Sequence, residues 1–259
     1  MPVLRLRIHV APLSFLEEQP LRLLRTAVRG PDGQGAVFAN AAAGVEVTVP
    51  WFEPRFWIAR GQLVASHAGR GASFVFEHAD RRFVLRHYRR GGLIARFSED
   101  RYPWLGEART RAMAELQLTM RLHAAGLPVP LPIAARYEQQ GIAYRADIIT
   151  EYLPDTQTLA QRLDAGEVGL DVWAAIGRCI RRFHDHGLCH ADLNAHNILL
   201  RDDKEVFLID FDRCARREPG LWRDANLARL RRSLDALEDR RSQRRFDDTQ
   251  WQCLLAAWF

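Results

Sequence analysis

The chain has 259 residues, of which 47% are hydrophobic and 27% are charged. This composition is ordinary for a folded globular protein and excludes a disordered or fibrous chain. No run approaches the roughly 18–20 consecutive apolar residues that cross a bilayer. The first residues interleave basic side chains with short apolar runs, unlike the continuous apolar core of a secretory signal. We therefore expect a cytoplasmic protein.

The basic residues are almost all arginine, since Lys204 is the only lysine, and the formal net charge is +5. Such a modest excess fits an anionic substrate or an acidic membrane surface. We predict neither a nucleic-acid nor a protein partner. No C-x-x-C pair occurs among the cysteines, which are Cys179, Cys189, Cys214 and Cys253. This pattern favours reduced thiols in a reducing compartment.

The N-terminal part of the chain carries the weakest pattern. Residues 30–35 are rich in turn formers, and residues 40–44 are small and featureless. We predict that residues 1–50 form an extension packed loosely on the main domain, which begins at residue 51.

Residues 51–153 are predicted to form a β-rich lobe with one long helix. The helix is expected over 107–125, because Gly126 and Pro128 supply the chemistry that ends helices. Apolar runs bounded by turn residues predict five strands. These strands are expected at 63–64, 74–76, 83–88, 133–137 and 144–151.

Residues 154–259 follow a helical pattern instead. Apolar residues from Val172 to Phe183 recur at helical spacing, with Asp171 as the expected N-cap and Gly187 as the expected stop. Two short strands are predicted at 197–200 and 206–209, and a further amphipathic helix is marked by Leu227, Leu230, Leu234 and Leu237. A β-rich lobe followed by an α-rich lobe gives an α+β fold.

The sharpest functional signal is H-A-D-L-N-A-H-N at 190–197, followed by a short apolar run that ends in Asp210. Phosphoryl transfer depends mostly on positioning and on electrostatic stabilisation by metal ions. Asn197 and Asp210 offer the hard oxygen ligands that Mg²⁺ prefers, if the two strands bring them together. Asp192, five residues before Asn197, is then placed to accept the proton of an attacking hydroxyl.

These residues resemble the H-x-D-x-x-x-x-N and D-F-G signatures of protein-kinase-like enzymes. The thirteen-residue step from Asn197 to Asp210 is also typical of that superfamily. The resemblance implies a bilobal, protein-kinase-like fold that uses ATP and Mg²⁺, with His190 and Asn194 supporting the catalytic loop. The alternative is a buried hairpin whose acids are merely solvated.

A zinc site is a second alternative, because His184, His186, His190 and His196 lie close together in the sequence. Zinc ligands are usually tightly spaced pairs that include cysteine or a carboxylate. His184 and His186 fit better as the end of a helix that stops at Gly187. We expect His190 to pack beneath the catalytic loop and orient it.

The nucleotide side of the site is predicted from the first lobe. Gly69 and Gly71 lie between its first two strands and resemble a shortened glycine-rich loop, whose backbone N–H groups can approach phosphates. The usual kinase lysine is absent from the third strand, where Arg86 retains the charge. Glu115 stands in an apolar helical stripe, where an acid needs a cationic partner. We pair it with Arg86.

Residues 150–153 resemble the kinase hinge. In that reading, adenine bonds the carbonyl group of Glu151 and the N–H of Leu153. A plain linker between the lobes is the alternative.

Longer stretches resemble one family, the 3-deoxy-D-manno-octulosonic acid (Kdo) kinases among the lipopolysaccharide kinases of Gram-negative bacteria. The resemblance covers roughly residues 50–237. It rests on R-H-Y-R-R-G-G at 86–92, G-L-P-V-P at 126–130, D-L-N-A-H-N at 192–197 and N-L-A-R-L-R-R-S-L at 226–234. It implies transfer of the γ-phosphate of ATP to the 4-hydroxyl of Kdo on the lipid A precursor, at the cytoplasmic face of the inner membrane.

The same resemblance assigns roles to individual residues. Asp192 becomes the base, Asn197 and Asp210 the metal ligands, and Arg86 with Glu115 the phosphate clamp. Core-heptose kinases and other small-molecule kinases remain alternatives, as does a kinase-like binding module without turnover. The retention of all three polar catalytic residues argues against that last alternative.

Departures from ordinary protein kinases favour a small or lipid-linked acceptor. Asp212 replaces the glycine of D-F-G, and no A-P-E segment follows to carry a peptide. Asn194 replaces the lysine that protein kinases commonly carry two residues after the base. Arg213 and Arg216 are candidates to supply the missing charge.

Arg89 and Arg90 are further candidates for binding the acceptor. Guanidinium groups pair well with carboxylates and phosphates, so these side chains suit an acidic sugar and lipid phosphates. The same residues would hold the protein on an anionic membrane surface. A solubilising loop is the alternative.

Overall fold

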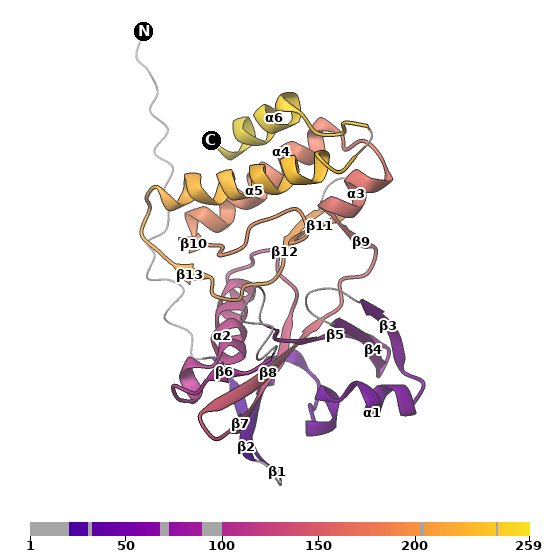
Figure 1. Cartoon of the computed structure of the whole chain (residues 1–259), viewed down its shortest axis with the longest axis vertical. Helices are drawn as coiled ribbons and strands as arrows, with labels where there is room; N and C mark the ends of the chain where they lie inside the picture. The colour runs from indigo at the N-terminus through magenta and orange to yellow at the C-terminus, as the bar shows by residue number, and fades with distance from the viewer. Residues whose placement is uncertain (1–20, 31–32, 68–72, 90–99, 203–204, 242) are drawn as a thin grey trace.

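The computed structural model describes residues 21–30, 33–67, 73–89, 100–202, 205–241 and 243–259. Figure 1 shows two parts, one dominated by a twisted sheet and the other by helices. The predicted α+β, bilobal architecture is confirmed.

Eight strands of the described chain form one antiparallel sheet, with β6 pairing to β8 outside the main path. The main path runs β1-β2-β7-β8-β5-β4-β3. The strands are β1 (Leu23–Gly30), β2 (Gly33–Asn40), β3 (Leu63–His67), β4 (Ser73–His78), β5 (Arg81–His87), β6 (Tyr102–Pro103), β7 (Pro132–Gln140) and β8 (Ala143–Glu151).

The structure differs from the prediction for residues 1–50. Residues 1–20 lie outside the described chain, but β1 and β2 continue the sheet beyond β7 and are not a loose extension. Ala36, Val37 and Phe38 are at most 4% exposed. Because both faces of β2 are covered, its sequence lacks the apolar–polar alternation that identifies most antiparallel strands.

Gly33 and Gly35, which suggested a turn-rich segment, allow close strand pairing in β2. A Cβ atom on Gly33 would lie 2.0 Å from the carbonyl oxygen of Gln139, and one on Gly35 would lie 2.2 Å from that of Tyr137. Both contacts are too close for any side chain. The glycines therefore allow β2 to approach β7 closely enough to pair with it.

Two apolar clusters cover the two faces of the sheet. Helix α2 (Arg111–Ala124) packs on one face, where Leu116 and Ile148 are buried. On the other face lie Trp51, Trp57 and Phe76, at and beside the short helix α1 (Pro54–Ala59), which the sequence did not predict. Helix α2 ends before Gly126, whose φ of +71° is the left-handed conformation expected of a C-terminal glycine.

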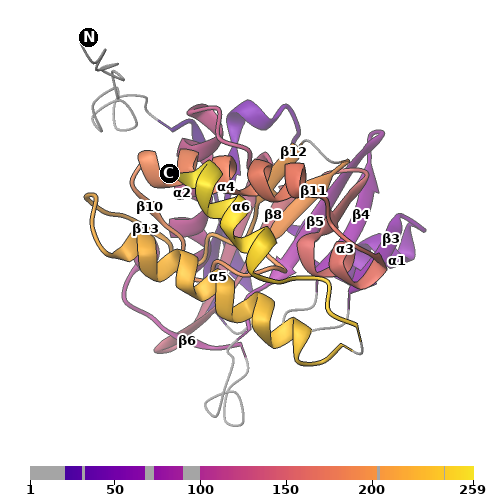
Figure 2. The ribbon, with the colours of Figure 1, turned by 90° about the horizontal axis from the view of Figure 1, so that it is seen from above.

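The second lobe has its own core, built around α4. Its N-cap is Gly169, and the predicted cap Asp171 lies within the first turn. A Cβ atom on Gly177 would lie 2.2 Å from the carbonyl oxygen of Leu254, so this glycine lets α6 pack closely on α4 (Figure 2). The helices are α3 (Leu159–Ala165), α4 (Leu170–Asp185), α5 (Trp222–Glu238) and α6 (Asp248–Trp258), of which α3 and α6 were not predicted.

Short strands frame the loops between these helices. They are β9 (Thr156–Thr158), β10 (Leu188–Cys189), β11 (Ile198–Arg201), β12 (Glu205–Leu208) and β13 (Ala215–Arg216). Strands β11 and β12 are the two that the sequence predicted around the turn at 201–204. They pair antiparallel, with Ile198 opposite Leu208.

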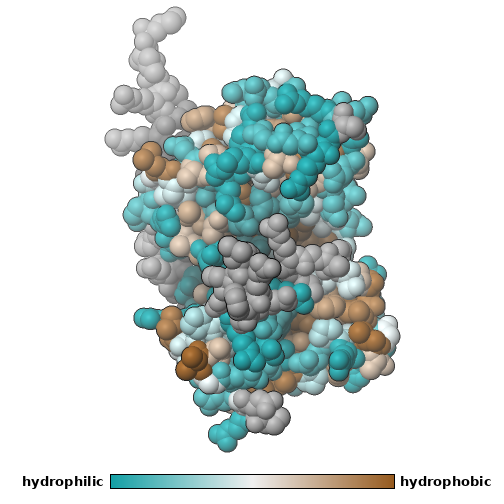
Figure 3. Space-filling model, viewed as in Figure 1, coloured by the Kyte–Doolittle hydropathy of each residue, from teal (hydrophilic) through white to brown (hydrophobic). Residues whose placement is uncertain are grey.

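The surface of the helical lobe is hydrophilic where α5 faces the viewer in Figure 3. Within the described part of the chain, no helix combines the length and the apolar character needed to cross a membrane.

Candidate active site

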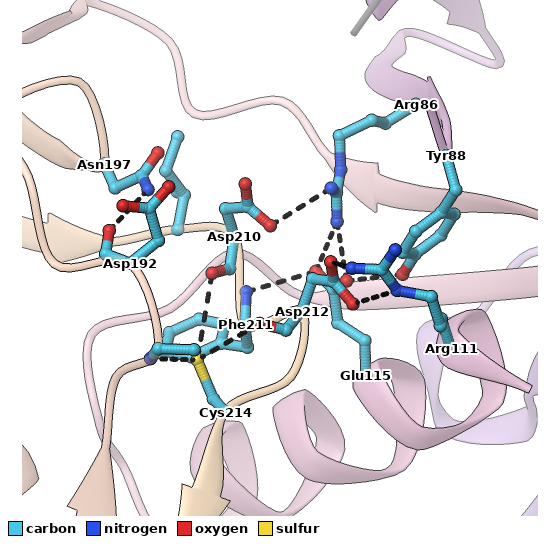
Figure 4. Close-up of polar contacts among 12 residues, drawn as sticks. Arg86, Tyr88, Arg111, Glu115, Asp192, Asn197, Asp210, Phe211, Asp212 and Cys214 are labelled. Carbon is cyan, nitrogen blue, oxygen red and sulfur yellow. Dashed lines mark hydrogen bonds and ion pairs between the residues drawn. The ribbon is translucent and has the colours of Figure 1, made fainter. Parts of the chain in front are cut away.

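The loop at 190–197 is held in shape by its own side-chain amides. Asn197 donates from Nδ2 to the main-chain oxygen of Asp192 at 2.9 Å (Figure 4). Asn194 donates to the same oxygen at 3.1 Å. Both bonds are made by the amide nitrogen, so the side-chain oxygen of Asn197 faces away from this contact. The loop therefore presents the Asp192 carboxylate and the Asn197 oxygen from one fixed backbone.

His190 lies buried beneath this loop, 2% exposed. Its Nε2 lies 3.1 Å from the carbonyl oxygen of Ile209, and its Nδ1 lies 3.2 Å from the main-chain nitrogen of Asp192. Burial lowers the pKa of His190, which favours the neutral ring. A neutral ring that donates from Nε2 and accepts at Nδ1 satisfies both contacts. It ties the loop to the strand end that carries Asp210.

The strand pair places Asn197 and Asp210 at the same end of the β11–β12 hairpin. The N–H of Ile209 donates to the carbonyl oxygen of Asn197 at 3.1 Å. The next residue, Asp210, has a φ of +63°, a conformation that non-glycine residues adopt rarely and that is common at functional sites. This turn directs the Asp210 carboxylate toward Arg86 in Figure 4.

Arg86 links the two lobes through a partly buried ion-pair cluster in which Glu115 is the buried member. Its Nη2 lies 2.6 Å from Glu115 and its Nη1 lies 3.1 Å from Asp210. Tyr88 donates its hydroxyl to the same glutamate. Burial raises the pKa of Glu115 above its ordinary value, while the Arg86 charge opposes that shift. The Arg86 guanidinium thus connects the sheet, helix α2 and the second lobe.

Helix α2 makes two further contacts with the D-F-D segment that were not predicted from the sequence. Arg111 forms an ion pair with Asp212, with Nε 2.8 Å from Oδ1. The N–H of Phe211 donates to Glu115 at 3.2 Å. Residues 111 and 115 are four apart and share one face of the helix. That face therefore fixes the backbone immediately after Asp210.

One stripe of α5 holds the catalytic loop from the other side. Asn226 exchanges two hydrogen bonds with the main chain of His190, both at 3.0 Å. Ser233 accepts from the N–H of Ala195 at 3.2 Å. Between them Arg229 pairs with the Asp192 carboxylate through Nε at 2.8 Å and through Nη2. Residues 226, 229 and 233 lie on one face of the helix, and this spacing is the sequence pattern from which their shared contact with the loop could have been predicted.

Arg229 changes the chemistry of the proposed base. Partial burial of Asp192 works to raise its pKa, but hydrogen bonds from Arg229 and Asn194 outweigh that effect, so the pKa is lowered. Asp192 is therefore ionised near neutral pH and able to accept a hydrogen bond from a hydroxyl.

The other predicted nucleotide-site and acceptor-site residues lie partly inside and partly outside the described chain. Gly69, Gly71 and Arg90 lie outside the described residues. Glu151 ends β8 with its carboxylate 2.7 Å from Arg81, and the carbonyl oxygen of Leu153 accepts from Thr156 at 2.9 Å.

The predicted replacements for the kinase lysine follow the D-F-D segment in the chain. Arg213 is exposed with a φ of +56°, and Arg216 lies in β13 opposite Leu188. Arg89 is also exposed. The cation that contacts Asp192 is Arg229.

The histidines considered for zinc are spread over different environments. His184 is buried and accepts from the indole N–H of Trp258 at 3.0 Å, and burial lowers its pKa to about 4. The Nδ1 of His186 lies 2.8 Å from the carbonyl oxygen of Arg182. Throughout the described ranges, no three His, Cys, Asp or Glu side chains form a group suited to a metal ion.

The residues at the hairpin end nevertheless fit Mg²⁺. The Oδ1 atom of Asp210 is buried, and its partner within the described chain is the Arg86 guanidinium, 3.1 Å away. A carboxylate at this position supplies a hard, anionic oxygen ligand, and an amide oxygen such as that of Asn197 is a second one. Two protein ligands suffice because Mg²⁺ ordinarily keeps waters and substrate phosphates as its other ligands.

The Arg86–Glu115 pair predicts a stability change. Arg86→Met leaves Glu115, 5% exposed, without its cation. We expect the free energy of unfolding to fall by about 3 kcal/mol in urea titrations, because an uncompensated buried charge is costly. Adding Glu115→Gln should recover part of the loss.

A matched control lies on the same strand. Arg82 pairs with Glu77 at 3.2 Å, but its side chain is 52% exposed. We expect Arg82→Met to cost at most about 1 kcal/mol, as exposed ion pairs do. Equal losses for the two arginines would contradict the structural role of the buried cluster.

Comparison with known proteins identifies the family of this chain. A curated 3-deoxy-D-manno-octulosonic acid kinase of Haemophilus influenzae (strain 86-028NP) is 40% identical over 235 residues, which cover 88% of this chain and 97% of that protein. Another, of Xylella fastidiosa (strain 9a5c), is 45% identical over 210 residues, covering 81% and 84%. A solved glucosamine kinase (crystal form B) is similar over 93% of this chain and 80% of that one, with a TM-score of 0.43 and 14% identity. A family model matches residues 54–258, and the chain therefore belongs to the lipopolysaccharide kinase (Kdo/WaaP) family.

Proposed function

We propose that this chain transfers the γ-phosphate of ATP to the 4-hydroxyl of Kdo on the lipid A precursor in lipopolysaccharide inner-core biosynthesis. The observation that carries the proposal is the convergence of Asp192, Asn197 and Asp210 beside the Arg86–Glu115 pair. Curated relatives of about 40% identity, named 3-deoxy-D-manno-octulosonic acid kinases, support this acceptor.

Each residue of the cluster has a role in that reaction. The Asp192 carboxylate accepts the proton of the acceptor hydroxyl as the new O–P bond forms. Asn197 and Asp210 would hold Mg²⁺, which supplies charge neutralisation at the ATP phosphates. Arg86, oriented by Glu115, contacts those phosphates in place of the kinase lysine.

The rest of the nucleotide site follows the kinase pattern. We place the glycines Gly69 and Gly71 over the phosphates, and adenine against the main chain of Glu151 and Leu153. Nucleotide binding then belongs mainly to residues 51–153, extended by β1 and β2, and acceptor binding to residues 154–259.

The D-F-D segment is compatible with an acceptor other than a peptide. Asp212, which replaces the glycine of D-F-G, forms an ion pair with Arg111, so the negative charge of Asp212 is neutralised within the protein. Exposed arginines such as Arg89 and Arg213 suit the phosphates of a lipid A precursor. We propose peripheral binding to the cytoplasmic face of the inner membrane, where the lipid acceptor is available.

Mass spectrometry tests the proposal directly. Incubation of the protein with Kdo-lipid A precursor and MgATP should add one phosphate to the acceptor, and fragmentation should place it at the 4-position of Kdo. Omitting Mg²⁺ should abolish the product.

An acceptor panel separates the alternatives. Phosphorylation of a heptose-bearing core, with no reaction of the Kdo-lipid A precursor, would replace the proposed substrate with a heptose. Binding of MgATP without transfer to any acceptor would favour a non-catalytic module.

A further inference from the structure

Within the described chain, Arg229 is the cation that pairs with the proposed base, Asp192. It extends from α5 and contacts only the Oδ1 atom of Asp192, through Nε and Nη2. The bonds of this ion pair use neither the Oδ2 atom of Asp192 nor the Nη1 atom of Arg229. They leave one carboxylate oxygen and one guanidinium nitrogen for a further ligand, side by side.

The placement of this guanidinium is fixed by its neighbours. Asn226, three residues before it, and Ser233, four residues after it, bind the main chain of His190 and Ala195. These contacts hold α5 against the catalytic loop over two helical turns. The Arg229 side chain is nevertheless 46% exposed and the Asp192 side chain 47% exposed, so an incoming molecule can reach both.

The proposed acceptor carries a group that matches this remaining guanidinium nitrogen. As its name states, Kdo is an acid, with a carboxylate at carbon 1 and a hydroxyl at carbon 4. Only carbons 2 and 3 separate the carbons that bear these groups. An acceptor hydroxyl at Oδ2 of Asp192 therefore brings its own carboxylate close to the Arg229 guanidinium.

We infer that Arg229 binds the carboxylate of the acceptor sugar and so makes the enzyme selective for an acidic sugar. An arginine suits this task better than a lysine. Its planar guanidinium can bind the Asp192 carboxylate along one edge and the acceptor carboxylate through its remaining nitrogen. This inference rests on the proposed function and names what that site recognises.

Two acceptors that differ only at carbon 1 test it: Kdo-lipid A precursor with its free carboxylate, and the same molecule as the primary carboxamide. For the wild-type chain we expect the carboxamide to lower kcat/KM by about 10- to 100-fold, the range for hydrogen bonds to charged groups. For Arg229→Gln we expect the same kcat/KM with both acceptors.

The ratio of kcat/KM for the carboxylate acceptor to kcat/KM for the carboxamide acceptor measures recognition of the carboxylate alone. Arg229→Gln also alters Asp192, but this effect and any change in the folded fraction act equally on the two acceptors and cancel in the ratio. Arg232→Gln, an exposed arginine on the same helix, is the matched control and should keep the wild-type ratio.

Three results would overturn the inference. One is an unchanged acid-to-amide ratio in Arg229→Gln, and another is a ratio near one in the wild type. The third is an equal fall of the ratio in Arg232→Gln, which would assign the preference to general positive charge. Failure of the wild type to phosphorylate either acceptor is a different result, because it would reject the proposed function itself.

Discussion

Asp192→Asn should lower kcat for phosphate transfer by about 10²- to 10⁴-fold, the usual contribution of a positioned general base. The amide is nearly the same size as the carboxylate but cannot take the proton of the acceptor hydroxyl. The loop should keep its shape, because the hydrogen bonds from Asn194 and Asn197 to the main-chain oxygen of residue 192 remain in the variant. Rates are measured at saturating MgATP and acceptor.

ATP binding separates loss of the base from loss of the fold. We expect MgATP to raise the melting temperature of Asp192→Asn as much as that of the wild type. Asp202→Asn is the control, since this aspartate is exposed in the β11–β12 turn with a φ of +49°, which asparagine also tolerates. Turnover of Asp192→Asn at the rate of this control would remove Asp192 from the role of base.

The features that were predictable from sequence are those encoded by short segments. Strands β4, β5 and β8 are apolar runs with turns beside them, and the sequence predicted all three. The loop at 190–197 and the hairpin that follows it span about twenty residues, so their order already implies that Asn197 and Asp210 meet. Glu115 was recognisable because an acid in an apolar helical stripe requires a partner.

Strand β2 was missed for a physical reason. It is covered on both faces, so its side chains do not alternate, and its glycines resemble those of a loop. Their function appears only when β7 lies beside them, with its carbonyl oxygens at the positions that a Cβ atom would occupy.

The roles of two arginines were also not predicted from the sequence. Arg111 and Arg229 lie in helices, where a surface arginine is common and does not indicate a site. Their partners, Asp212 and Asp192, are 101 and 37 residues away in the sequence. Arg213 and Arg216 were predicted to meet the phosphate charge and stay candidates for that role, whereas the cation that pairs with Asp192 comes from a helix farther along the chain.

Asp210→Asn is expected to cost more than about 100-fold in Mg²⁺-dependent turnover, because loss of a residue that only supports a metal ligand already costs 10- to 100-fold. The amide removes the charge that faces Arg86 and leaves a weaker oxygen ligand. The dependence of the initial rate on Mg²⁺ concentration should move to much higher concentrations. Arg86 keeps Glu115 as its partner, so the fold should survive.

Asp212→Asn provides the contrast, two residues farther along the same segment. Its carboxylate is paired with Arg111 and not with Arg86 (Figure 4). We expect this change to lower stability while leaving the Mg²⁺ concentration for half-maximal rate unchanged. If both variants shifted the Mg²⁺ dependence equally, the effect would belong to the segment as a whole. If neither did, Asp210 would not be a metal ligand, and the ion pair with Arg86 would be its only remaining role.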